Sequence, residues 1–186
     1  MRTMLNNLML LVYDVEEMRI KNIYEVEGVK FSELLLELSR ILIPSESLAI
    51  LLTRDVYMRS MLEILDMLEH REHRYVDTII SIFSGKCLIA VSWESTFIRE
   101  ERLISGITID MRPGYFYADL FNRQCKNINL LYIIAEVEQS KIRLFAEVER
   151  SGTRKRIKLN LHYIDKAESI EDLLTRICSE CQHAFF

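Results

Sequence analysis

Three strand-like segments follow one another between Asn129 and Ile164, and they constrain the fold more than any other part of the chain. In each segment apolar and polar residues alternate, and alternate residues of a strand lie on opposite faces of a sheet. The apolar positions are Leu131, Ile133, Ala135 and Val137, then Ile142, Leu144, Ala146 and Val148, then Ile157, Leu159, Leu161 and Tyr163. One apolar and one largely polar face per strand predict an antiparallel meander covered on one side only.

The turns of this meander predict its register. Two-residue turns fit at Gln139 and Ser140 and at Ser151 and Gly152, where glycine accepts a positive φ. The expected pairs are Val137 with Ile142, Ala135 with Leu144, Glu138 with Lys141, Glu136 with Arg143, Ala146 with Ile157, Leu144 with Leu159, Glu147 with Arg156 and Glu149 with Arg154. A slip of one residue would set apolar against charged residues. The glutamates are therefore expected in cross-strand ion pairs, not in a metal or acid–base cluster.

The rest of the chain predicts an α+β fold: an N-terminal strand and helices, then a mainly antiparallel sheet of about five strands, with a closing C-terminal helix. Residues 5–13 fit either a helix or a buried strand, and 18–26 fit a strand. Ser32 is the expected N-cap of a helix that ends at about Leu42, and a second helical segment begins at Ser45. Strands are expected at 86–94 and 103–111, and a loop or short helix at 115–123. Ser169 and Asp172 resemble a capping pair.

These elements fit one domain over residues 1–186. Its helical part covers about 31–84, its sheet part about 86–164 and its closing helix about 170–182. The chain is 49% hydrophobic and 28% charged with a net charge of −4, which is typical of a globular protein and argues against a general nucleic-acid coat. No apolar run approaches the ~20 residues of a membrane span. Four cysteines in a chain of 186 residues do not suggest a disulfide framework, so a cytoplasmic location is expected.

The segment from 46 to 84 carries more apolar residues at helical spacing than a small domain can easily bury. The spacing of Tyr57, Met61, Ile64, Leu65 and Leu68 predicts one apolar stripe, and that of Tyr75, Val76, Ile79, Ile80 and Phe83 predicts another. Most of these residues are expected in the core. The excess predicts that a second copy of the chain covers part of this surface, which makes a homo-oligomer the expected state.

A zinc site is one alternative. Cys178 and Cys181 are three residues apart, and so are His70 and His73, so the four side chains could complete a tetrahedral set. Against this, Cys178 and Cys181 share a helical face with Leu174 and Ile177, where free cysteine acts as a small hydrophobic residue. No cofactor is expected unless this zinc set forms.

Nucleic-acid binding is the other alternative, because basic residues crowd the hairpin 150–158. A basic β-ribbon can follow a phosphate backbone. Neighbouring glutamates and the lack of aromatic residues at the tip argue for an ordinary solvated turn. The candidate contacts are Arg150, Arg154, Lys155, Arg156 and Lys158.

A third cluster of polar residues surrounds the hairpin formed by 86–94 and 103–111, where strand ends can carry a site. No phosphate-binding glycine loop, nucleophile elbow or zinc-protease motif occurs in the chain. The cluster consists of Trp93, Glu94, Ser95, Thr96, Asp110, Arg112, Tyr115, Tyr117 and Asp119.

The sequence therefore favours an intracellular, non-catalytic interaction or adaptor protein that self-associates through its helical segment. The nucleic-acid hairpin and a small zinc protein or metalloenzyme stay open as alternatives. The sequence identifies no protein partner, substrate or pathway, because a fold does not determine a function.

Overall fold

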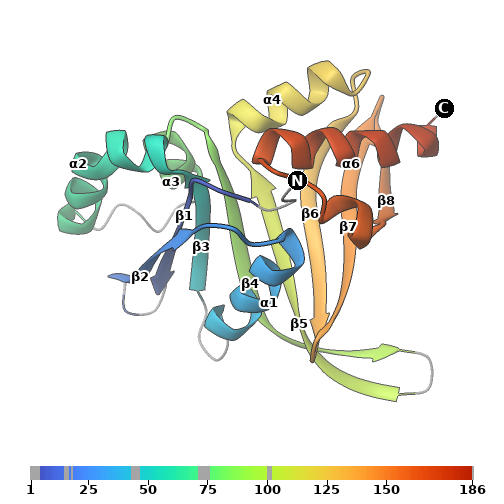
Figure 1. Cartoon of the computed structure of the whole chain (residues 1–186), viewed down its shortest axis with the longest axis horizontal. Coiled ribbons are helices and arrows are strands. Elements are labelled where there is room, and N and C mark those ends of the chain that lie inside the picture. The colour runs from blue at the N-terminus through green and yellow to red at the C-terminus, as the bar shows by residue number, and fades with distance from the viewer. Residues whose placement is uncertain are drawn as a thin grey trace.

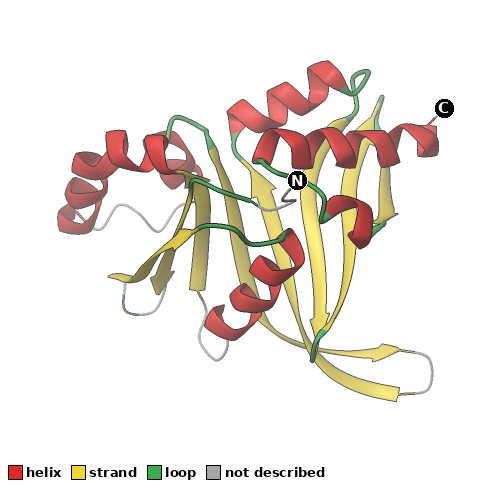
Figure 2. Ribbon diagram, viewed as in Figure 1, coloured by secondary structure: helices red, strands yellow, loops and turns green. Residues whose placement is uncertain are grey.

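Eight strands form one antiparallel sheet that runs through the whole chain (Figures 1 and 2). The computed structural model describes residues 5–14, 17, 19–42, 47–70, 76–99 and 102–185. In chain order the strands are β1 (Leu8–Asp14), β2 (Arg19–Val26), β3 (Ser47–Thr53), β4 (Cys87–Arg99), β5 (Arg102–Pro113), β6 (Asn129–Glu138), β7 (Lys141–Arg150) and β8 (Thr153–Leu159). Their order across the sheet is β2-β1-β3-β4-β5-β6-β7-β8. The antiparallel sheet is confirmed, but the expected number of about five strands is wrong.

Helices cover the two faces of this sheet unequally. They are α1 (Phe31–Leu42), α2 (Arg54–His70), α3 (Val76–Ile82), α4 (Tyr115–Gln124), α5 (Leu161–Ile164) and α6 (Ile170–Phe185). Side chains of α1, α4, α5 and α6 share one hydrophobic core with the sheet, whereas α2 and α3 share a second core with β1, β3 and β4 on the opposite face. Strands β1 and β3 and the first residues of β4 are therefore buried on both faces, whereas the edge strand β2 is largely exposed. The described helices that pack on β5 to β8 lie on one face of these strands.

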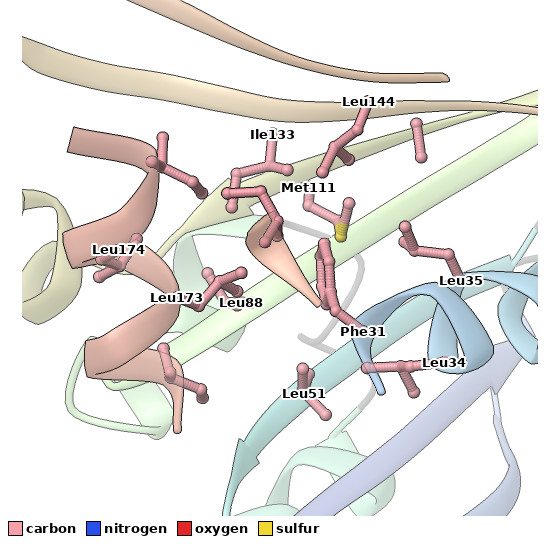
Figure 3. Packing of buried hydrophobic residues seen from close by; sticks show 14 of the residues in the cluster. Phe31, Leu34, Leu35, Leu51, Leu88, Met111, Ile133, Leu144, Leu173 and Leu174 are labelled. Atoms are coloured by element: carbon pink, nitrogen blue, oxygen red, sulfur yellow. The ribbon is translucent and has the colours of Figure 1, made fainter. Parts of the chain in front are cut away.

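The larger core lies between α1, α6 and the middle of the sheet. Figure 3 shows Phe31 of α1 between the helix and the strands, and Leu173 and Leu174 of α6 on the same side of the sheet. All three side chains are buried. The predicted closing helix is confirmed, and its predicted cap is present because the Asp172 backbone N–H donates to Ser169 Oγ at 3.0 Å.

Strand β3 replaces part of the expected helix. Residues from Ser45 onward were expected to be helical, but Ser47–Thr53 pair with β1 on one side and β4 on the other. Residues Leu48 to Leu52 are all buried, because each face of this strand meets a different core. A strand covered on both faces shows no apolar–polar alternation, so its sequence resembles a buried helix.

The meander β6–β7–β8 has the predicted register. Val137 lies opposite Ile142, Glu136 opposite Arg143 and Ala146 opposite Ile157, as do the other expected pairs. Ser151 and Gly152 both have positive φ, as the predicted tight turn requires. The third segment is shorter than expected, because β8 ends at Leu159 and the chain turns into α5.

Strands β4 and β5 extend beyond the sheet as a two-stranded ribbon (Figure 1). The pairing of β4 with β3 ends at Ser92, and the pairing of β5 with β6 begins at Ile107. Among the described strands, the segments between these points pair only with each other.

The N-terminus of α1 is capped by a residue that is distant in sequence. The helix begins at Phe31, so Ser32 is not its N-cap. Instead, the Ser32 backbone N–H donates to Asp165 Oδ1 at 2.8 Å, and Ser32 Oγ donates to Asp165 Oδ2 at 2.5 Å. This carboxylate also lies at the positive end of the helix dipole.

A disulfide joins Cys125, just after α4, to Cys178 in α6. The two Cα atoms are 5.6 Å apart, and 53 residues separate the cysteines in sequence. The expectation that the cysteines form no disulfide framework is therefore corrected for this pair. Spacing alone could not reveal it, because the pairing depends on how α4 and α6 pack.

Candidate functional site

Helix α2 carries an exposed apolar surface. Its inner side is buried through Val56, Tyr57 and Ile64, which pack in the core shared with α3. On its outer side Met58, Met61 and Leu62 are 57%, 38% and 80% exposed. Residues three and four apart lie on the same side of a helix, so these three side chains form one surface, the α2 stripe.

The charges of α2 are distributed unevenly along its length. Its first half holds Arg54 and Arg59 with one acidic residue, whereas its second half holds Glu63, Asp66 and Glu69. The described ion pairs of this helix, Arg54 with Glu25 at 2.8 Å and Arg59 with Asp55 at 3.1 Å, are exposed. Exposed pairs contribute at most about 1 kcal/mol and can exchange partners. The basic first half therefore complements the acidic second half.

The structure divides the five basic residues of the hairpin 150–158 between the two faces of the sheet. Lys155 lies opposite the buried Val148, and its Nζ donates to the Ala184 carbonyl at the end of α6 at 2.7 Å. The same Nζ is 4.6 Å from the Phe185 ring centroid. Arg150 is on the same face as Lys155, because strand positions alternate. Lys155 therefore binds the last turn of a helix, where cations are favourable.

The other three basic residues lie on the face of β8 that none of the described helices covers. Arg154 Nε is 3.5 Å from Glu147 Oε1, and the Arg156 guanidinium is 5.6 Å from the Phe145 ring centroid. Lys158 is exposed and lies opposite Phe145. Both signs of charge alternate over this face, which holds Asp110, Arg112, Glu136, Glu138, Lys141, Arg143, Glu147, Glu149, Arg154, Arg156 and Lys158.

Asp110 is a partly buried carboxylate of this face. Burial raises the pKa of Asp110, the positive charge of Arg156 lowers it and the negative charge of Glu147 raises it. Asp110 lies opposite the buried Ile134, which explains why water is partly excluded. A single perturbed carboxylate beside an arginine is typical of a structural ion network as well as of a site.

Two members of the expected zinc set, Cys178 and Cys181, lie one turn apart in α6, but His70 is in a different helix. Cys178 is in the disulfide, and Cys181 is buried in the core below α6, where burial raises its thiol pKa to about 12. His70 ends α2 on the opposite face of the sheet, and His73 lies outside the described residues. Within the described ranges no group of three or more His, Cys, Asp or Glu side chains could hold a metal ion.

The third polar cluster is also dispersed. Tyr117 is buried in the core below α4, and burial strongly raises the pKa of its hydroxyl. Asp119 pairs with Arg123 at 3.0 Å on the exposed side of α4, while Asp110 lies on the other face of the sheet. The side chains of the members from 93 to 96 lie outside the described part.

The comparisons with known proteins identify no relative. The chain matches no protein-family model, and no curated protein and no solved structure is similar enough to count as a match. None of the helices in the described ranges is long and apolar enough to cross a membrane.

Proposed function

We propose that this chain is a non-catalytic interaction protein that self-associates through α2. The observation that carries the proposal is the exposure of Leu62, Met58 and Met61 on one side of a helix whose other side is buried. Leucine exposed to this extent is ordinary when isolated, but three large apolar side chains at helical spacing are characteristic of an interface. Methionine adapts its shape to a partner surface.

Charge complementarity favours a second copy of the chain as the occupant. A two-fold axis brings the same surface of both copies together, so every contact between two different residues occurs twice, once in each direction. When two α2 helices pack antiparallel about an axis near Met61 and Leu62, the N-terminal end of each helix, which carries Arg54, lies beside the part of the other helix that carries Asp66. The apolar side chains then meet at the centre of the interface.

The expected affinity is modest. Full burial of one exposed Leu or Met side chain is worth about 1.5–3 kcal/mol. The stripes of both copies together therefore supply on the order of 10 kcal/mol, while association costs about 4–15 kcal/mol. At the lowest of these costs about 6 kcal/mol remains, which corresponds to a dimer that dissociates at tens of micromolar.

Sedimentation velocity over a micromolar concentration series tests the proposal. The wild-type protein should approach twice the chain mass of 22.0 kDa, and Leu62→Glu should stay at the chain mass because it places a charge at the centre of the stripe. Tyr115→Glu is the matched control, since Tyr115 is 56% exposed at the start of α4. A wild-type protein that is monomeric throughout, or equal dissociation by both variants, would overturn the proposal.

A second candidate function is nucleic-acid contact by Arg154, Arg156 and Lys158, which is supported by their common position on the uncovered face of an edge strand. Binding of a labelled duplex should weaken as salt rises, and replacing all three by alanine should reduce the salt dependence by roughly 0.9 per lost phosphate contact. An unchanged salt dependence in the triple variant would remove this candidate.

A further inference from the structure

A small polar cavity lies between α2 and the turn that joins α3 to β4. Its volume is about 270 Å³, slightly below the range of typical ligand pockets. The cavity is on a different side of α2 from the α2 stripe. Its lining residues are Val56, Arg59, Ser60, Glu63, Ser84 and Lys86.

The turn that forms one wall is held rigidly. Ser84 and Gly85 both have positive φ, and the Gly85 N–H donates to the Ile80 carbonyl at 2.8 Å, closing the end of α3. The Gly85 carbonyl in turn accepts from the Phe116 N–H at 3.2 Å. The positions of Ser84 and Lys86 at the cavity are therefore fixed by backbone contacts before any ligand arrives.

The polar groups of the cavity are incompletely used by the protein itself. Ser60 is only 6% exposed, and among the described residues its Oγ has one weak contact, to the Ile82 carbonyl at 3.4 Å. Lys86 Nζ lies 4.9 Å from the Phe116 ring centroid and forms no ion pair with a described residue. Arg59 bonds Asp55 on the exposed side of the helix. A buried hydroxyl with spare capacity beside two cations is suited to an anionic ligand.

The negative charge of Glu63 limits which anionic ligands the cavity can bind. Glu63 opposes a ligand with several negative charges, because like charges at short range repel. It favours a ligand that carries a hydrogen-bond donor next to its anionic group. Val56 is the one aliphatic residue in the described lining, so a mainly apolar ligand is not expected. The volume admits a molecule about as large as a single amino acid.

We propose that this cavity binds a small carboxylic acid that also carries an ammonium or hydroxyl group. Lys86 and Arg59 hold the carboxylate, Ser60 and Ser84 contribute hydroxyl hydrogen bonds, and Glu63 accepts from the donor group of the ligand. Arg59 and Glu63 also belong to the charged halves of α2 that support self-association. The two proposals are still tested separately, because Leu62 of the α2 stripe does not line the cavity and Lys86 lies outside α2.

Isothermal titration of the full chain with four organic probes and with inorganic phosphate tests the proposal. L-Serine and glycolate carry both a carboxylate and a donor group, whereas acetate and ethanolamine each lack one of them. L-Serine or glycolate should bind saturably, at least about tenfold more tightly than acetate or ethanolamine. Absence of saturable binding of all four probes at millimolar concentration would overturn the proposal, as would tighter binding of inorganic phosphate.

Substitutions of the cavity residues test whether the probes bind in this cavity. Lys86→Met should weaken the binding of L-serine or glycolate, whichever binds more tightly, at least about tenfold. Glu63→Gln should reduce the difference in affinity between that probe and acetate. Lys166→Met, at an exposed position away from the cavity, is the matched control and should bind as the wild type does. If Lys86→Met does not fold, Arg59→Met tests the same cationic wall from an exposed position. Equal binding by Glu63→Gln, Arg59→Met and the control would contradict the assignment.

Discussion

Gly114 is a residue at which the backbone leaves no room for a side chain. A Cβ added there would overlap the Gly85 carbonyl oxygen and would lie 2.8 Å from the Cys87 carbonyl oxygen. Both obstacles are backbone atoms, so the turn or the start of α4 would have to move. Gly114→Ala is expected to lower the free energy of unfolding by about 2–3 kcal/mol, measured by urea denaturation.

Gly152→Ala is the control for this substitution. Nothing lies within 4 Å of a Cβ at Gly152, but its φ is +80°, so alanine there costs only backbone energy of about 1 kcal/mol. The need for glycine at 152 is evident in the sequence from the turn. The need at 114 is not, because it arises from contact with a turn almost thirty residues earlier. An equal decrease in the free energy of unfolding in Gly114→Ala and Gly152→Ala would contradict the steric explanation.

Asp110 should make the stability of the protein depend on pH. The pKa of Asp110 is raised above 3.8, mainly by burial, so the folded chain keeps this proton to higher pH than the unfolded chain. Asp110 therefore contributes most to the stability of the fold below pH 3.8, and this contribution is lost as the pH rises through the raised pKa. Asp110→Asn should raise the unfolding temperature at pH 7, and this advantage should shrink toward pH 4. A variant that is less stable than the wild type at pH 7 would show that the attraction of Arg156 outweighs burial.

Whole elements differ in how far local sequence specifies them. The meander β6–β8 could be predicted with its register because both faces, both turns and the charge pairs agree on one alignment. Strand β3 could not, because burial on both faces removes the alternation from Ser47 to Thr53.

The basic hairpin was identified as a cluster in sequence, but strand alternation separates Arg150 and Lys155 from the other three. Proximity in sequence is therefore a poor guide to a shared surface in a strand.

The cap of α1 is an element-scale prediction that local sequence could not provide, because its acceptor is 133 residues away. Asp165→Ala removes both bonds to Ser32 and the negative charge at the start of the helix. The expected loss is about 1–2 kcal/mol in the free energy of unfolding, measured by urea denaturation. Asp165→Asn keeps an oxygen acceptor and should lose less. If Asp165→Ala unfolds at the wild-type urea concentration, the contact does not stabilise the fold.

At the scale of the whole molecule, the chain is held together by contacts between its two ends. Asp165 caps α1, and α6 shares its core with α1 and the central strands (Figure 3). The cavity residues come from two segments, 56–63 and 84–86, that match no motif. Their proximity depends on the packing of α2 against the turn after α3, so the cavity could not be predicted from sequence. The helical spacing predicts Met61 of the α2 stripe but neither Met58 nor Leu62, and Tyr57 and Ile64 of the same predicted spacing are buried in the core.

The disulfide between Cys125 and Cys178 should contribute strongly to the stability of this arrangement. It closes a loop of 53 residues, for which the loss of entropy in the unfolded chain corresponds to about 4 kcal/mol. Cys125→Ser with Cys178→Ser should lower the free energy of unfolding by about that amount. Reducing agent should destabilise the wild type by a similar amount and leave the double variant unchanged.

Thiol titration of the unfolded wild type, purified without reductant, should find only Cys87 and Cys181 free. Four free thiols would contradict the bond and would agree with the expected cytoplasmic location, because disulfides persist mainly in oxidising compartments.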